Sequence, residues 1–325
     1  MTVTSKDVSI VGFKAAALVQ RELPELEVKE VRGKTLCSLV SPGTEITGDY
    51  LGASFPKFPG YSAIFQVEEL GSEVEGIAVG MTLFCPGSHR SVQQVAMDRV
   101  VPVPPNLKPE VAVLARLMGV TLTTLMTTVA RPGDSVLVIG AGPIGFLAAQ
   151  TFKQAGYDVG VVEPHSVRRD AVKSSGINRV YESVPVDDAD IQGKVALVLE
   201  CSGNEQAAIQ GCRIVRKRGE VVLVGVPWQK RTDATAFDLM SAVFLNYAVL
   251  RSGWEWELPW TQKDDFRPWS VMEGFSRCLR WLSEGRIRHE GLVATWKPED
   301  CETLYQQLSE SRCQGLFQVF DWRQP

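Results

Sequence analysis

Three glycines in the middle of the chain have the spacing that brings phosphate groups close to a protein backbone. Gly140, Gly142 and Gly145 follow an apolar run at 136–139 and precede a helix-forming stretch. In such a strand–turn–helix unit, the first glycine permits a tight turn and the second lets a pyrophosphate approach. The third lets the helix pack closely on the strand. Unpaired N–H groups and the helix dipole favour anions at the helix N-terminus. The pattern therefore predicts a dinucleotide site.

An acidic residue at the end of the next predicted strand indicates which dinucleotide is preferred. Glu163 lies 23 positions after Gly140. A carboxylate there accepts hydrogen bonds from the adenosine ribose hydroxyls and repels a 2′-phosphate. This favours NAD over NADP, although Arg168 follows closely enough to reach a phosphate. The other predicted cofactor-binding residues lie in the glycine turn or after later strands: Pro143, Ile144, Ser202 and Gly225.

The elements that position these residues alternate between strand and helix. Apolar runs predict strands at 136–139, 159–162, 196–199 and 221–224. Helical patterns separate them at 144–155, 166–174 and 206–215. This alternation is typical of a doubly wound parallel sheet with right-handed crossovers, the Rossmann arrangement. Ligands of such sheets bind beyond the carboxyl ends of the strands, where Ser202 and Gly225 follow.

The first third of the chain has a different pattern of apolar runs and turns. Short apolar runs alternate with turns rich in glycine and proline, at 15–19, 35–40, 63–67, 82–84 and 92–103. This predicts an antiparallel, barrel-like β domain. A helical pattern over 109–130 would bridge the two domains, and 270–285 and 315–321 predict a further helix and a late strand. The fold class is α/β, with a catalytic domain at 1–115 plus 290–325 and a Rossmann domain at 116–289.

Composition excludes several other classes of protein. The 325 residues are 45% hydrophobic and 22% charged, which is typical of a water-soluble globular protein. A net charge of −4 without a basic stripe argues against nucleic-acid binding. No apolar run is long enough to predict a membrane span, and the polar N-terminus is unlike a secretory signal. Seven scattered cysteines, never spaced C-x-x-C, favour reduced thiols in the cytoplasm.

Several short motifs together resemble the medium-chain dehydrogenase/reductase superfamily. They are SPGTE at 41–45, FPGY at 58–61, VGMTLF at 79–84, RPGDSVLVIG at 131–140 and LVGVP at 223–227. The resemblance covers nearly the whole chain. It implies a GroES-like catalytic domain, a Rossmann domain, and hydride transfer between a nicotinamide cofactor and a small polar substrate. It also suggests a homodimer formed through the edge of the Rossmann sheet, near residues 235–260.

The chain departs from this family where a catalytic zinc is usually held. Zinc-dependent members use a Cys, a His and a second Cys, and the corresponding positions here resemble Ser41, Tyr61 and Met118. None of these is a usual zinc ligand in this setting. The family's four-cysteine structural lobe is missing as well, because Cys85 has no partner cysteines nearby in the sequence. We therefore expect neither a catalytic nor a structural metal.

Without zinc, side chains must polarise the substrate oxygen and move its proton. Three candidates are Glu45, Tyr61 and His89, which we expect to line the reacting carbon. Each has a structural alternative. Glu45 would only tie down the turn that precedes it, Tyr61 would be a packed aromatic residue, and His89 would be a surface residue of its loop.

A cluster of four tryptophans narrows the expected class of substrate. Trp254, Trp256, Trp260 and Trp269 lie in a segment that resembles the branch of the family acting on sugars and glycosides, including hexoside 3-dehydrogenases. Indole faces stack on the C–H faces of pyranose rings, but they also pack domain or dimer interfaces. The leading hypothesis is a zinc-independent, NAD-linked dehydrogenase of a sugar, glycoside or cyclitol. The alternatives are an NADPH-dependent quinone or enoyl reductase and a non-enzymatic dinucleotide-binding protein.

Overall fold

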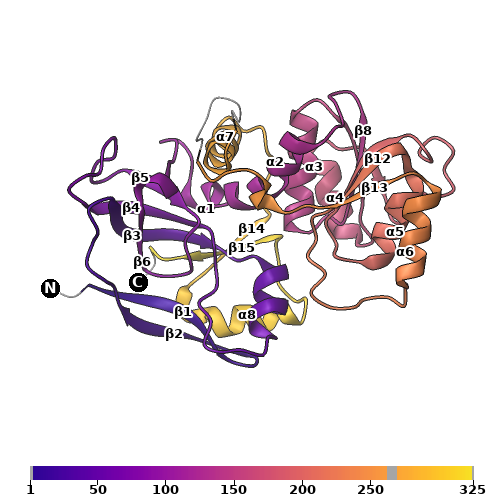
Figure 1. The fold of residues 1–325 in the computed structure, drawn as a ribbon. Coiled ribbons are helices and arrows are strands. Elements are labelled where there is room, and N and C mark those ends of the chain that lie inside the picture. Colours follow the sequence, from indigo (N-terminus) through magenta and orange to yellow (C-terminus); the bar gives the residue numbers. More distant parts are fainter. Residues whose placement is uncertain (1–2, 262–268, 324–325) are drawn as a thin grey trace. The chain divides into compact units, whose positions relative to one another are not determined.

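The computed structural model describes residues 3–261 and 269–323, and the chain divides into two compact units (Figure 1). Unit 1 contains Met1–Arg116, Phe275–Gly285 and His289–Pro325. Unit 2 contains Leu117–Gly274 and Arg286–Arg288. These bounds differ from the sequence-based division mainly at Phe275–Gly285, which clusters with unit 1, where Phe275 packs against Phe84 with ring centroids 4.9 Å apart.

Unit 1 is built on mainly antiparallel strands, as predicted. A separate hairpin pairs β1 (Thr4–Gly12) with β2 (Ala15–Glu22). A seven-stranded sheet has the order β14-β15-β3-β4-β5-β7, and β6 pairs with β3. Its strands are β3 (Glu30–Leu39), β4 (Ala63–Leu70), β5 (Thr82–Cys85), β6 (Val92–Ala96), β7 (Val101–Pro102), β14 (Val293–Trp296) and β15 (Phe317–Asp321). Only the β14–β15 pair in this sheet is parallel.

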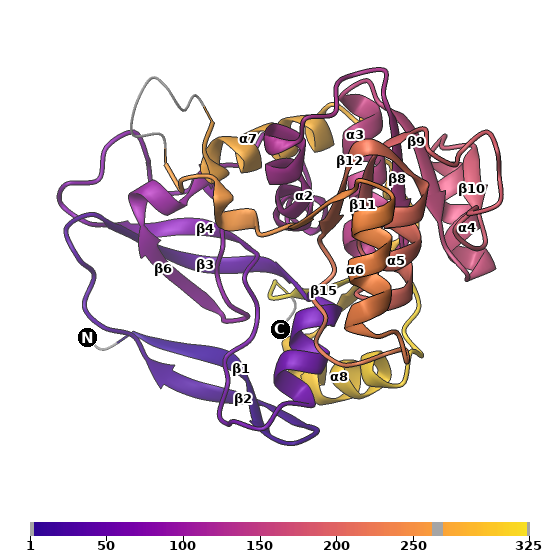
Figure 2. The ribbon, with the colours of Figure 1, turned by 45° about the vertical axis from the view of Figure 1, so that its right-hand side comes forward.

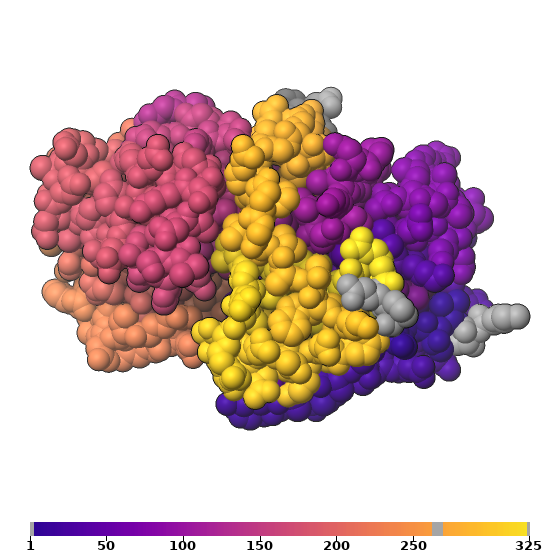
Figure 3. All heavy atoms as spheres, turned by 180° about the vertical axis from the view of Figure 1, so that it is seen from behind, coloured from indigo at the N-terminus to yellow at the C-terminus, as the bar shows by residue number. Residues whose placement is uncertain are grey.

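Short helices complete unit 1. They are η1 (Gly43–Tyr50), η2 (Met97–Arg99), α1 (Pro109–Ala112), η4 (Pro298–Asp300) and α8 (Cys301–Ser309). Helix α8 packs against β2, and in Figure 3 the yellow C-terminal part of the chain lies against the indigo N-terminal part. Their shared core includes Val8, Tyr50, Leu304, Tyr305 and Phe320. Helices η1 and α8 were not predicted from the sequence, and this packing places Tyr50 of η1 in one core with Phe320 of β15.

Unit 2 contains the predicted parallel sheet. Its strand order is β10-β9-β8-β11-β12-β13, which matches the 3-2-1-4-5-6 order of a Rossmann fold. The strands are β8 (Ser135–Ile139), β9 (Asp158–Val162), β10 (Arg179–Tyr181), β11 (Val195–Glu200), β12 (Val215–Leu223) and β13 (Val249–Ser252). All five pairings are parallel, so their carboxyl ends meet at one edge. The order reverses between β8 and β11, which is where such sheets bind dinucleotides.

The helices of unit 2 follow its strands. They are α3 (Pro143–Gln154), α4 (Ser166–Ser174), α5 (Glu205–Ile214), α6 (Ala236–Leu245) and η3 (Glu255–Glu257). Figure 2 shows α5 and α6 side by side. The Asn204 side chain caps α5, and Thr235 with Asp238 forms a capping box that starts α6. Both caps supply acceptors for N–H groups that a helix start leaves without partners.

The predicted bridging helix over 109–130 is two helices. The chain leaves α1 at Ala112, and α2 (Ala115–Thr127) begins in unit 1 and continues in unit 2. Helix α7 (Val271–Ser283) also has residues in both units. By length and hydropathy, the stretch Pro109–Thr127 is sufficient to cross a membrane, but 78% of its apolar window is buried in the structure. Such burial is typical of a core helix.

Candidate active site

The glycine turn has the geometry that its spacing predicted. Gly140 has a φ of +92°, a conformation that side chains disfavour. A Cβ atom on Gly145 would lie 1.8 Å from the carbonyl oxygen of Gly140, so only glycine fits there. A Cβ on Gly142 would meet no atom within 4 Å, and α3 begins directly after it with Pro143 and Ile144 in its first turn. The space beside Gly142 and the free N–H groups of α3 suit an approaching phosphate.

Glu163 lies directly after β9 and is tied to the glycine turn. One carboxylate oxygen accepts a hydrogen bond from the Ala141 N–H at 2.8 Å, and the other accepts one from the His165 N–H at 2.9 Å. The Arg168 guanidinium lies 3.9 Å from the same carboxylate and is half-exposed. A carboxylate has about four acceptor positions, so Glu163 retains capacity for ribose hydroxyls.

The ends of β11 and β12 bring Ser202 and Gly225 to the same edge of the sheet. Glu200 holds this region together, because its carboxylate accepts hydrogen bonds from the Ser202 N–H at 2.7 Å, the Ser202 hydroxyl and the Gly203 N–H at 3.1 Å. Its backbone carbonyl accepts one from the Gly225 N–H at 2.7 Å. Burial raises the pKa of the Glu200 carboxyl above its ordinary value. A Cβ on Gly140 would contact Ser202, so the predicted cofactor residues converge.

The three predicted catalytic residues are linked in unit 1. The Tyr61 hydroxyl donates a hydrogen bond to the Ser41 hydroxyl, and the Ser41 N–H donates to Glu45 Oε1 at 2.7 Å. Glu45 Oε2 lies 3.0 Å from His89 Nε2 and accepts a hydrogen bond from the Tyr305 hydroxyl at 2.6 Å. One buried carboxylate therefore organises the loop after β3 that carries Ser41, and Ser41 in turn holds Tyr61.

These residues differ in their exposure to solvent. Glu45 and His89 have no exposed surface, whereas Tyr61 is partly exposed. The other ring nitrogen of His89 lies 2.8 Å from the Ser38 hydroxyl, so both of its nitrogens are occupied. Glu45 does tie down its turn through Ser41, as the structural alternative proposed, and His89 is not a surface residue. Of the three, Tyr61 is the one that retains some exposed surface.

The environment of Tyr61 favours its protonated form. Burial raises the pKa of the Tyr61 phenol, and this outweighs the hydrogen bond to Ser41 and the Arg116 charge, which lower it. The Arg116 guanidinium lies 4.6 Å from the Tyr61 ring centroid, in cation–π geometry. The phenol is thus a proton donor held in place by a hydroxyl on one side and a cation over its ring.

Sequence reasoning did not identify four residues of these sites: Ser38, Arg116, Glu200 and Tyr305. Glu200 had a usable signal, because it ends a buried strand just as Glu163 follows one. Tyr305 had none, since 260 positions separate it from Glu45. Met118, the third position expected to correspond to a metal ligand, is buried in α2 within unit 2.

Comparisons with known proteins agree with this architecture. A profile of the zinc-binding dehydrogenase family matches residues 143–257. L-threonine 3-dehydrogenase of Pyrococcus furiosus is 30% identical over 240 residues, covering 62% of this chain and 68% of that protein. D-arabinitol dehydrogenase 1 of Uromyces fabae is 22% identical, covering 91% of this chain and 92% of its own.

A solved structure extends the likeness to the whole fold. The crystal structure of galactitol-1-phosphate dehydrogenase from Escherichia coli superposes with a TM-score of 0.82, covering 97% of this chain and 99% of that one at 17% identity. The sequence likeness to the threonine dehydrogenase, the matched family profile and the observed strand order agree with one another. The chain therefore belongs to the zinc-binding dehydrogenases of the medium-chain dehydrogenase/reductase superfamily and is an oxidoreductase.

Proposed function

We propose that this oxidoreductase transfers a hydride between NAD and the carbon of a secondary alcohol or ketone in a sugar, glycoside or cyclitol, without a catalytic zinc. The observation that carries the proposal is the Ser41–Tyr61 hydroxyl pair, anchored by Glu45 at the positions that resemble the family's metal ligands. The glycine turn, Glu163, Arg168, Ser202 and Gly225 would hold the dinucleotide. The N–H groups at the start of α3 would receive its phosphates.

The donor atoms at the expected metal positions do not suit zinc. Zinc in proteins is held by cysteine sulfur, histidine nitrogen or carboxylate oxygen. Ser41 and Tyr61 offer neutral hydroxyls that are already bonded to each other, and Met118 offers a thioether. Among residues 3–261 and 269–323, no group of three or more His, Cys, Asp or Glu side chains is arranged to hold a metal ion. These observations support proton transfer by side chains.

Tyr61 is the residue proposed to move the proton. Bound NAD would supply the nicotinamide carbon that takes up or releases the hydride. In ketone reduction, the neutral Tyr61 phenol donates its proton to the carbonyl oxygen, and the oxidation of an alcohol reverses this transfer. Glu45 and His89 act as positioning residues, because they are buried and bond to each other. They fix Ser41, and Ser41 orients the Tyr61 hydroxyl.

The substrate class rests on the tryptophans and on a relative. Trp256 and Trp260 stack on each other with centroids 4.5 Å apart, so much of their surface is used in packing. Trp254 is 63% exposed, just after β13, and offers a free indole face for a sugar ring. The related D-arabinitol dehydrogenase is named for a polyol. Purified protein with NAD and a panel of glycosides and inositols should produce NADH absorbance; turnover of enones alone would reject this class.

The cofactor preference depends on Glu163, and we expect Glu163→Ser to lower kcat/KM for NAD by about tenfold relative to that for NADP. The substitution removes the ribose acceptor and the charge that repels a 2′-phosphate. It also removes the acceptor for the Ala141 N–H, so thermal unfolding must show that the variant folds. Steady-state kinetics with both cofactors measures the ratio. A wild-type protein that already prefers NADPH would instead support the quinone or enoyl reductase alternative.

A homodimer through α6 and β13 is also part of the proposal. Phe237, Met240 and Phe244 are 70–80% exposed and lie on one face of α6. Tyr247 and Val249 continue this surface to β13, which pairs only with β12 among the described strands. An apolar helix face beside an open strand edge is unfavourable in water, and a second copy covers both at once.

The proposed location is the cytoplasm. Free thiols on all seven cysteines fit this location.

The double substitution Phe237→Asp/Phe244→Asp should convert the dimer into a monomer, because two charges would have to be buried in the interface. Val167→Asp is the matched control, since Val167 is 80% exposed but lies on α4. Analytical ultracentrifugation of the three proteins at micromolar concentration tests this. A wild-type monomer, or a double variant that remains dimeric, would contradict the proposal.

A further inference from the structure

A polar groove on unit 1 is lined by none of Ser41, Glu45, Tyr61 and His89. It has a volume of about 380 Å³ and is lined by β1, β2, the loop before β6, η4 and the residue after β15. The lining residues used below are Thr4, Lys6, Gln20, Ser91, Glu299 and Trp322. The volume is within the range of small-molecule sites.

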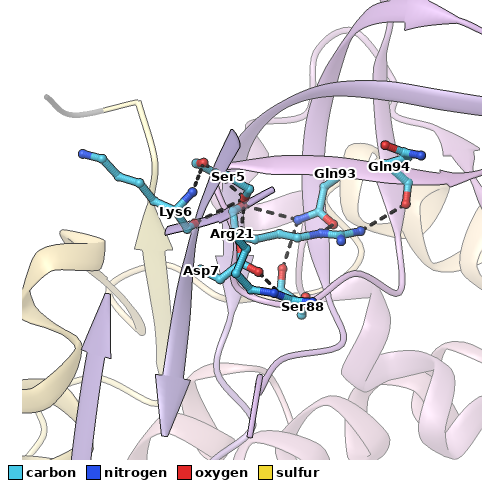
Figure 4. A network of polar contacts seen from close by, with 9 residues as sticks. Ser5, Lys6, Asp7, Arg21, Ser88, Gln93 and Gln94 are labelled. Atoms are coloured by element: carbon cyan, nitrogen blue, oxygen red, sulfur yellow. Dashed lines mark hydrogen bonds and ion pairs between the residues drawn. The ribbon is translucent and has the colours of Figure 1, made fainter. Parts of the chain in front are cut away.

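The floor of the groove is rigid. The Ser5 hydroxyl donates to Asp7 at 2.6 Å, and the Lys6 N–H donates to the Ser91 hydroxyl at 2.8 Å (Figure 4). Asp7 also receives a bond from Arg21 at 3.2 Å. Figure 4 shows the Lys6 side chain pointing away from this network. The hydrogen bonds hold the hydroxyls of the floor in place before any ligand arrives, which reduces the entropy cost of binding.

Trp322 provides an aromatic wall. Its indole N–H donates to the Ser38 hydroxyl at 2.9 Å, and its backbone N–H donates to the Leu36 carbonyl at 3.0 Å. The ring is therefore fixed while it remains partly exposed. A fixed indole beside hydroxyl and amide groups suits a ligand with one apolar face and many hydroxyls.

The charges around the groove favour a neutral ligand. Lys6 Nζ and Glu299 Oε1 are 3.9 Å apart, and both side chains are half-exposed. The positive charge of Lys6 and the negative charge of Glu299 offset each other at the rim of the groove. The remaining polar groups, Thr4, Gln20 and Ser91, are uncharged and both donate and accept hydrogen bonds. Anions and cations therefore gain little here.

We propose that this groove binds a neutral polyhydroxylated ligand, such as a monosaccharide or the sugar end of a glycoside. The proposal does not rest on the catalytic role of Tyr61. Trp322 serves as the stacking surface, and Gln20 and Ser91 bond the ligand hydroxyls.

The test uses the full-length protein labelled with 5-fluorotryptophan and fluorine NMR. Trp322→Phe assigns the Trp322 resonance among the eight tryptophans. Titration with methyl glucoside should shift that resonance saturably in the millimolar range, and inorganic phosphate should not. Gln20→Ala should weaken the affinity by about fivefold through a lost hydrogen bond. Gln229→Ala, an exposed glutamine in unit 2, is the matched control and should bind like wild type.

Three results would overturn the proposal. They are a Trp322 resonance that does not respond to glucosides, one that responds to phosphate instead, and an affinity that Gln20→Ala leaves unchanged. Sugar binding at the catalytic site alone would shift other tryptophan resonances and leave that of Trp322 in place. The groove and the proposed dehydrogenase activity can therefore fail independently.

Discussion

Replacing Gly145 with alanine is expected to raise the dissociation constant for NAD by about 100-fold or more and to destabilise unit 2. The new methyl group would lie 1.8 Å from the Gly140 carbonyl oxygen, which is backbone and has no rotamer to adopt. Relief requires α3 to move away from β8, which displaces the helix N-terminus that receives the phosphates. Overpacking of this kind costs about 3 kcal/mol in the free energy of unfolding. Urea denaturation and calorimetric titration with NAD measure the two effects.

Gly142→Ala is the matched control within the same turn. A Cβ there meets no atom within 4 Å, so the free energy of unfolding should change by about 1 kcal/mol or less. NAD affinity should still fall by about tenfold, because the methyl group occupies the space through which a pyrophosphate approaches the backbone. Equal destabilisation by both substitutions, or unchanged NAD binding in Gly142→Ala, would contradict the assignment of these two glycines.

The parallel sheet could be predicted because its central strands carry a simple signal. Strands β8 and β11 are buried on both faces, so they appear in the sequence as continuous apolar runs that end at glycine or a polar turn. Helix α6 and strand β13 were not predicted from the sequence. For α6 the reason is the opposite one. Large apolar side chains cover the exposed side of α6, so its sequence lacks the polar face of a typical surface helix.

The cofactor site was more predictable than the catalytic network because its residues are local. The glycines and Glu163 belong to consecutive elements, and their spacing alone indicates their roles. Glu45 is four positions from Ser41, but its other partners are 44 and 260 positions away. The fold brings His89 and Tyr305 to the same oxygen of Glu45, Oε2. No local sequence pattern can predict this contact. For the same reason, the sequence could not separate the partly exposed Tyr61 from the fully buried Glu45 and His89.

Tyr61→Phe should lower kcat for sugar or polyol turnover by about 100-fold or more, with little change in NAD affinity. The substitution keeps the ring under Arg116 and removes only the hydroxyl proposed to carry the proton, and general acid–base catalysis contributes effects of this size. Because burial raises the pKa of Tyr61, the phenol stays protonated well above neutral pH. Wild-type ketone reduction should therefore not lose rate through Tyr61 between about pH 7 and 9.

Tyr50→Phe separates a catalytic role from a structural one. Tyr50 is also buried in unit 1, its hydroxyl donates to Glu302 at 3.0 Å, and burial raises its pKa to about 12. Both substitutions should cost about 1 kcal/mol in the free energy of unfolding, since each removes one hydrogen bond. Only Tyr61→Phe should lower kcat. If both variants retain wild-type kcat, Tyr61 is a packed aromatic residue and the proton leaves by another group. If both lose activity equally, the loss reflects the integrity of unit 1, and the proposed proton transfer by Tyr61 is wrong.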